Sequence, residues 1–205
     1  MNYVEELLPE AMIEAQGCPE PLIVRHLRTA MVEFYRESKA WRYTTEPASV
    51  TVGERAVELD LPTGTAVLRV YWAKLAGKVL QAVSPRNLRE VIARPTGYAI
   101  NGITRVVYLD SMPDQNYILD GVEANVALLP LRSLEELPDE LFDQHRDGIL
   151  YGALAKLLMM RNVPWSDPQG AMNYQAMANG QMLQAQRQAD SQQAPVTRVV
   201  KYGGI

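Results

Sequence analysis

One stretch near the C-terminus decides how this chain is interpreted: residues 138–170 read PDELFDQHRDGILYGALAKLLMMRNVPWSDPQG. Apolar residues recur in it at helical spacing, which predicts a helix that starts near Pro138. The predicted core stripe of this helix is Phe142, Ile149, Ala153, Leu157 and Met160. A corner follows, made of Pro164, Trp165, Ser166, Asp167 and Pro168. Ser166 and Gln169 have the spacing of a capping box, which predicts a second helix that runs to about Ala189.

Two glycines lie four residues apart on the first of these helices, Gly148 and Gly152. They remove side chains from one side of the helix, which predicts a close approach by another helix despite the usual glycine penalty. The helix that follows the corner is the natural neighbour. Acidic residues crowd the start of the first helix, where the backbone dipole stabilises negative charge. We prefer this explanation of them to a catalytic or metal-binding role. They are Glu135, Glu136, Asp139 and Glu140.

The N-terminal part of the chain is also predicted to be helical. Residues 5–16 form a short helix that ends at Gly17, and Pro19 and Pro21 suit the first turn of a longer helix to about Lys39. The predicted core stripe of this longer helix is Ile23, Leu27, Ala30, Met31 and Phe34. Arg25, Arg28 and Arg36 lie off this stripe, and we interpret them as a solvated face or neighbour contacts in preference to an anion site.

Between the helical ends, residues 41–132 show a period near two with frequent turn residues, which indicates a meander of short strands. The clearest strand is 66–76, where Leu68, Val70 and Trp72 are expected on one face, with a Gly77-Lys78 turn leading into 79–83. A short helix is expected from Ser84, with its apolar side made by Leu88, Val91 and Ile92. Further strands are expected at 104–109, 117–119 and 124–131, the last two separated by a turn at Asp120-Gly121.

These patterns predict an α+β fold. The N- and C-terminal helices, residues 1–40 and 133–190, are expected to form one helical bundle domain. Residues 41–132 are then an inserted antiparallel β-rich lobe, because the insertion begins and ends at shifts in composition. Residues 191–205 are predicted to be an extended C-terminal arm.

The arm follows a glutamine-rich spacer, residues 184–193, and its sequence is typical of a strand without a partner strand nearby. We interpret it as a segment that grips another protein through its backbone, with a simple frayed terminus as the alternative. Residues 196–202 would span roughly 23 Å if extended, at about 3.3 Å per residue. The predicted partner-binding residues are Val196, Thr197, Arg198, Val199, Val200, Lys201, Tyr202, Gly203, Gly204 and Ile205.

Composition excludes several classes of protein. The formal net charge of −4 argues against a protein that clings to nucleic acid, since that needs clustered Lys and Arg. No apolar run is long enough to span a bilayer, and the N-terminus lacks a basic region followed by an apolar one, so neither membrane insertion nor export is expected. Cys18 stands alone beside two histidines, which leaves no disulfide and no zinc ligand set, and no cofactor is predicted.

An enzyme is the weaker interpretation. The chain has no nucleophile elbow, no P-loop, no dinucleotide-binding glycine motif and no H-E-x-x-H. His145 has Asp143 and Asp147 two residues away on either side, but helical geometry puts residues two apart on different faces. Asp110, Asp114 and Asp120 lack calcium-loop spacing and sit beside turn residues. We therefore assign no catalytic residue.

The helical hairpin, with Tyr151-Gly152-Ala153-Leu154 and Val163-Pro164-Trp165-Ser166-Asp167-Pro168, resembles the C-terminal signature of head-to-tail adaptor (connector) proteins of short-tailed bacteriophages. Upstream features that resemble the same family in the same order are Trp41-Arg42-Tyr43, Leu61-Pro62, Val107-Tyr108-Leu109 and Met112-Pro113. The similarity covers most of the chain, and it is densest in the final helix pair.

The resemblance implies a structural virion protein at the head–tail junction, made in the host cytoplasm. It implies a ring of about twelve copies beneath the portal protein, with a tail nozzle or tube protein on the other side and DNA passing through the centre without specific binding. The helices would then form the collar against the portal, the strands would face the tail, and the arm would reach along the portal. A tail-tube or minor capsid ring component is the first alternative, and a small soluble enzyme without a recognisable motif is the second.

Overall fold

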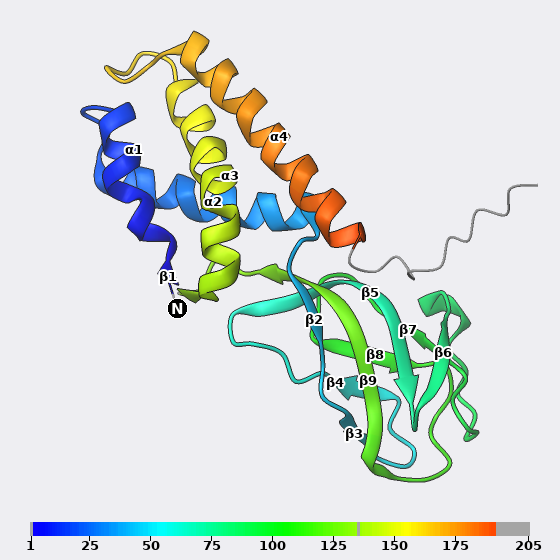
Figure 1. Cartoon of the computed structure of the whole chain (residues 1–205). Helices are drawn as coiled ribbons and strands as arrows, with labels where there is room; N and C mark the ends of the chain where they lie inside the picture. The colour runs from blue at the N-terminus through cyan, green and yellow to red at the C-terminus, as the bar shows by residue number, and fades with distance from the viewer. Residues whose placement is uncertain (1, 135, 192–205) are drawn as a thin grey trace, which may run out of the picture.

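The computed structural model describes residues 2–134 and 136–191. Within this part, four α-helices gather at one end of the molecule and a curled mixed sheet forms the other end (Figure 1). The α+β class predicted from the sequence is therefore confirmed.

The N-terminal segment folds as the sequence predicts. A 3-10 turn, Val4–Leu7, leads into α1 (Leu8–Glu14), and after Gly17, which has a φ of +81°, the chain enters α2 (Glu20–Ser38). All five predicted stripe residues of α2 are buried, and Tyr35 joins them. The helix ends where Lys39 adopts a left-handed φ of 54° and its N–H donates to the carbonyl oxygen of Tyr35.

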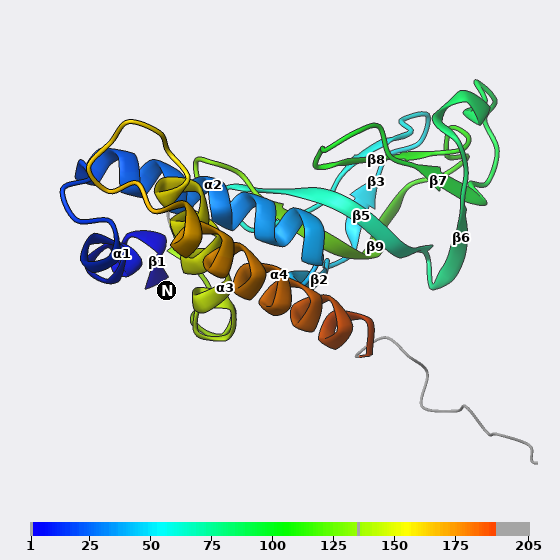
Figure 2. The ribbon, with the colours of Figure 1, turned by 90° about the horizontal axis from the view of Figure 1, so that it is seen from above.

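The C-terminal helices are α3 (Asp139–Leu158) and α4 (Pro168–Ser191), and both contact α2 (Figure 2). Along α4 the buried residues are alanines: Ala171, Ala178, Ala185 and Ala189. Because three of them recur every seven residues, α4 presents a seam of small side chains to its neighbours. Ion pairs join α3 to the other helices, Arg146 to Glu10 on α1 and Lys156 to Glu33 on α2.

The main sheet has the strand order β2-β9-β5-β6-β7-β8-β4, and β3 also pairs with β9. Its strands are β2 (Arg42–Thr44), β3 (Ala48–Val50), β4 (Ala56–Glu58), β5 (Thr65–Leu75), β6 (Lys78–Ala82), β7 (Gly97–Ala99), β8 (Val106–Leu109) and β9 (Tyr117–Pro130). A separate two-stranded sheet joins β1 (Asn2–Tyr3) to β10 (Glu136–Leu137). The predicted antiparallel lobe needs one correction, because β6 and β7 pair in parallel.

The expected turn at Asp120-Gly121 is wrong, since both residues lie inside β9. Ala48 pairs with Val122 and Val50 with Tyr117, so two steps along β3 correspond to five along β9, and three β9 residues bulge outward. Gly121 is needed at this point because a Cβ there would lie 1.7 Å from the carbonyl oxygen of Ala48. The glycine thus permits a close strand approach instead of a turn.

Two other local expectations are wrong. The alternation expected along β5 is interrupted by register shifts between Val67 and Arg69 and between Val70 and Trp72. The helix expected after Ser84 is a single 3-10 turn, Pro85–Asn87, although Ser84 does accept a hydrogen bond from the Arg86 N–H. Beyond that turn the backbone pairs with the segment after β8, for instance through the Arg89 N–H, which donates to the Asp110 carbonyl. Ile92, expected on the buried side of the helix, is 65% exposed.

One cluster of buried apolar side chains runs from the helices into the sheet. Trp41 lies at the junction: its ring centroid is 5.8 Å from that of Tyr35 on α2, and its carbonyl oxygen accepts from the Leu128 N–H of β9 at 2.8 Å. This shared core holds the two ends of the molecule together. The division into a helical domain of 1–40 and 133–190 and an inserted domain of 41–132 stays a prediction.

Candidate assembly surfaces

The predicted corner at residues 164–168 joins α3 to α4, and its cap differs from the one expected. Asp167, not Ser166, caps α4: its Oδ1 accepts from the Gly170 N–H at 3.0 Å, and its carbonyl accepts from Ala171. The Asp167 N–H in turn donates to the carbonyl of Leu158 at the end of α3. Asp167 therefore serves both helices. The predicted cap, Ser166, is one residue too early, because Ser166 and Asp167 are adjacent and either side chain is able to cap a helix.

Gly148 and Gly152 face α2. A Cβ on Gly148 would lie 2.5 Å from a ring carbon of Phe34 on α2 and 3.2 Å from the Cβ of Gln181 on α4. A Cβ on Gly152 would lie 3.5 Å from that of Ala30, also on α2. The neighbour that comes closest at both glycines is thus α2, whereas the sequence pointed to α4.

The end of α4 lies against the helix–sheet junction. Asp190 forms an ion pair with Arg42 of β2 at 3.3 Å, and Gln188 accepts a hydrogen bond from Gln144 of α3 at 2.9 Å. The Arg42 guanidinium also lies 3.4 Å from the ring centroid of Tyr71 on β5. Of the predicted arm, residues 191–205, Ser191 is the last residue of α4. The rest of the arm, with the predicted partner-binding residues 196–205, lies outside the described residues, so its role stays a prediction. The contacts of Asp190 and Gln188 fix the position of the last turn of α4, which ends at Ser191.

The outer face of α4 carries no formal charge from Pro168 to Gln186. Three large apolar side chains on it are exposed, those of Met172, Met177 and Leu183. A second exposed apolar feature is the bulge of β9, where Ile118 is 72% and Leu119 is 85% exposed. Sequence reasoning missed the bulge because it placed Asp120-Gly121 in a turn. Exposed apolar groups of this kind are typical of surfaces that contact other proteins.

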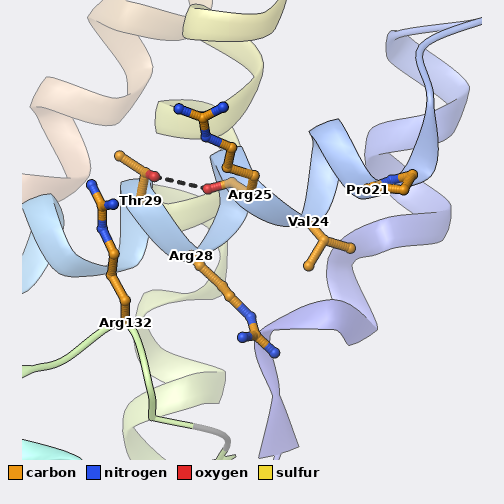
Figure 3. A pocket seen from close by; sticks show the side chains of 6 residues that line it. All are labelled: Pro21, Val24, Arg25, Arg28, Thr29 and Arg132. Carbon is orange, nitrogen blue, oxygen red and sulfur yellow. Dashed lines mark hydrogen bonds between the residues drawn. The ribbon is translucent and has the colours of Figure 1, made fainter.

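A basic hollow of about 310 Å³ lies beside α2 (Figure 3). Its charged lining is Arg25 and Arg28 of α2 and Arg132 of the loop after β9, with Thr29 between them along α2. Arg28 is neutralised by Glu5, whose carboxylate accepts from its Nε at 2.7 Å. The sequence predicts a solvated face or neighbour contacts for Arg25 and Arg28, and the ion pair of Arg28 with Glu5 is such a contact. Arg132 was not connected with them, because it lies more than a hundred residues away in the chain.

The residues considered for catalysis do not form a reaction centre. His145 is buried against the rings of Phe34 and Tyr35 and burial lowers its pKa, while Asp143 and Asp147 point away and are exposed. Burial by itself raises the pKa of Asp110, but hydrogen bonds from Gly97 and Thr96 and the charge of Arg89 hold it below the usual value. Among residues 2–134 and 136–191, no group of three or more acidic, His or Cys side chains is placed to hold a metal ion.

No helix in the described part of the chain combines the length and apolarity needed to cross a bilayer. A comparison with protein families matches residues 1–199 to the SU10 adaptor protein family. The chain belongs to this family. The match extends over the helices and the whole sheet, in agreement with a resemblance that covers most of the chain and is densest in the helical hairpin. A search among curated proteins finds no match to the chain.

Membership of the SU10 adaptor family identifies a phage adaptor and implies a structural, non-enzymatic role in the virion. The adaptor resemblance is thereby confirmed at the level of the family. The exposed apolar side chains of α4 and β9 and the basic hollow agree with this role, because they offer surfaces for contacts with other proteins.

Proposed function

We propose that this SU10-family adaptor works as a head-to-tail adaptor of the short-tailed phage type. In this proposal about twelve copies close into a ring that joins the portal protein to the tail and surrounds the DNA exit channel. The family match over residues 1–199 is the observation that carries the proposal. The elongated shape, with helices at one end and the sheet at the other, supports a molecule that meets different partners at its two ends (Figure 1).

In the proposed ring, the helices face the portal and the sheet faces the tail. The latch to the portal is the arm that follows Ser191. It departs next to Arg42 and Gln144, which hold the last turns of α4 in place. A single flexible arm binds weakly, since ordering a chain costs about 1–2 kcal/mol per residue in backbone entropy. A ring presents many arms at once, and the high effective concentration makes their attachment durable.

Truncation after Ser191 tests the latch. We expect the shortened protein to stay folded and soluble, because all contacts within residues 2–134 and 136–191 are kept, and to lose its binding to portal rings in a pull-down. A matched control keeps the full length but carries Val196→Ser, Val199→Ser and Val200→Ser, which lowers β propensity without removing charge. The arm is not the latch if the truncated protein binds portal rings as well as the full chain does.

Each copy carries a formal charge of −4, so a ring of copies is strongly acidic. We propose that DNA slides through the channel because acidic walls repel the phosphate backbone. A tail-tube or minor capsid ring component would also form a ring. Electron microscopy of the protein mixed with portal rings distinguishes the two, since an adaptor binds the portal directly.

A further inference from the structure

The basic hollow beside α2 holds positive charge that the described residues, 2–134 and 136–191, do not neutralise. Of its three arginines, Arg28 is paired with Glu5. Arg25 and Arg132 are exposed, and neither forms an ion pair with any residue in 2–134 or 136–191. Figure 3 shows the Arg25 side chain extending from α2 and that of Arg132 from the loop after β9. Guanidinium groups bind carboxylates through two parallel hydrogen bonds, so the hollow is suited to acidic side chains.

An acidic stripe of this kind lies on α3, formed by Glu140, Asp143 and Asp147. All three residues are exposed, and among the described residues none of them is in an ion pair. Their spacing places them on one face of the helix, and residues four apart have Cβ atoms about 5–6 Å from each other. Asp143 and Asp147 therefore present two neighbouring carboxylates to a partner.

The hollow and the stripe face opposite ways. Asp143 and Asp147 are each two positions from His145, which packs on α2, and at 3.6 residues per turn this puts their side chains on the far side of α3. In the same way Arg25 lies two residues from the fully buried Leu27, on the far side of α2. Since α2 and α3 pack on each other, the periodicity of the two helices puts the basic surface on one side of this helix pair and the acidic surface on the other. The ribbon of the two helices is seen in Figure 2.

Two complementary surfaces on opposite sides of one chain are what a head-to-tail contact between identical copies requires. We propose that the acidic stripe of one copy docks into the basic hollow of the next copy, with Asp143 and Asp147 against Arg25 and Arg132. This inference rests on the proposed ring and names the surfaces that close it. Each copy then donates one stripe and accepts one, and the contact repeats around the ring.

A second copy fits the hollow better than DNA does. Phosphate-backbone binding needs an extended basic surface, whereas Arg25 and Arg132 form a small pair on a chain with a net charge of −4. A long DNA duplex would also be repelled by the acidic remainder of the ring. The stripe, by contrast, supplies two carboxylates for the two guanidinium groups that form no ion pair with a described residue.

Charge exchange tests the pairing on the full-length protein. One variant carries Arg25→Glu and Arg132→Glu, and the other carries Asp143→Lys and Asp147→Lys. In the first variant the hollow and the stripe are both acidic, and in the second both are basic, so copies of one variant repel each other at the contact. We expect the concentration needed for self-association of either variant alone to rise about tenfold or more. Mixed together, the two variants form alternating contacts of opposite charge, and we expect association to return to the wild-type level. Mass photometry and sedimentation follow the species formed.

Arg86→Glu with Arg94→Glu is the matched control, because it makes the same change in charge at exposed positions in the sheet loops. Wild-type association should also weaken at about 1 M salt, where the Debye length falls to about 3 Å. If wild-type rings form and either charge variant forms them equally well, or the mixture fails to recover, the pairing is wrong and the proposed ring stands. If the wild type forms rings neither alone nor on portals, the proposed function itself fails.

Discussion

Replacing Gly148 with alanine tests how closely α2 and α3 approach. The added Cβ would lie 2.5 Å from Cε2 of Phe34, a contact that real structures do not tolerate. The Phe34 ring has little room to move, because it is buried and packed against the rings of Tyr35 and His145 at 5.5 and 5.2 Å. The two helices must therefore separate, or the ring must leave its rotamer.

Two effects set the magnitude. Alanine in place of glycine stabilises a helix interior by about 0.5–1 kcal/mol, and overpacking a core costs about 1–3 kcal/mol. We expect Gly148→Ala to lower the free energy of unfolding by about 1–2 kcal/mol. Gly152→Ala is the matched control, because its Cβ would meet Ala30 at an ordinary 3.5 Å, and we expect it to raise stability by about 0.5–1 kcal/mol.

Urea unfolding followed by circular dichroism measures the free energy of unfolding of both variants. In thermal unfolding, we expect the melting temperature to fall for Gly148→Ala and to rise for Gly152→Ala, by about 2–4 °C per kcal/mol. In a Phe34→Leu background the penalty of Gly148→Ala should shrink, since the clashing ring is gone. A Gly148→Ala protein as stable as Gly152→Ala would refute the close contact with Phe34.

Two further predictions concern the helices. Asp167→Ala should destabilise the protein by about 1 kcal/mol in urea unfolding because α4 loses its cap, whereas Ser166→Ala should change little, and equal effects would contradict the assignment of the cap. His145 is buried and its pKa is lowered, so the unfolded chain binds its proton more tightly and stability is lost as pH falls from about 6.5 toward the folded pKa. His145→Leu should reduce the fall in stability between pH 7 and 5, measured by urea unfolding, and His26→Gln serves as comparison because the pKa of His26 is also lowered by burial. If stability falls between pH 7 and 5 as steeply in His145→Leu as in the wild type, His145 is not the source of the pH dependence.

The long helices were predictable because their signals are local. The stripe from Ile23 to Phe34 repeats over several turns, and proline marks the starts of α2 and α4. The sheet was less predictable because its partners are distant. Gly121 resembles a turn glycine until Ala48, more than seventy residues earlier, is placed against it. The segment after Ser84 has the sequence of a helix start, yet its backbone pairs with residues after β8 instead.

The same reason limits what the sequence could tell about the assembly surfaces. Arg25 and Arg28 were visible on one helix, but the hollow exists only because the loop after β9 brings Arg132 beside them. The helix dipole explains Asp139 and Glu140 in the first turn of α3. Asp143 and Asp147 lie further along, and the sequence suggests no role for them except as partners of His145, which helical geometry argues against. Family membership rests on a match over residues 1–199, whereas the sequence features that resemble adaptor proteins are densest in the final helix pair.

Assembly on the portal tests the central claim most directly. Purified full-length protein is mixed with portal rings from the same phage, and the complexes are imaged by electron microscopy with symmetry analysis. The proposed function predicts a collar of about twelve copies bound to one face of each portal, with an open channel and with the helical end of every copy toward the portal. Portals that stay bare, or that carry single molecules without a closed collar, would contradict it.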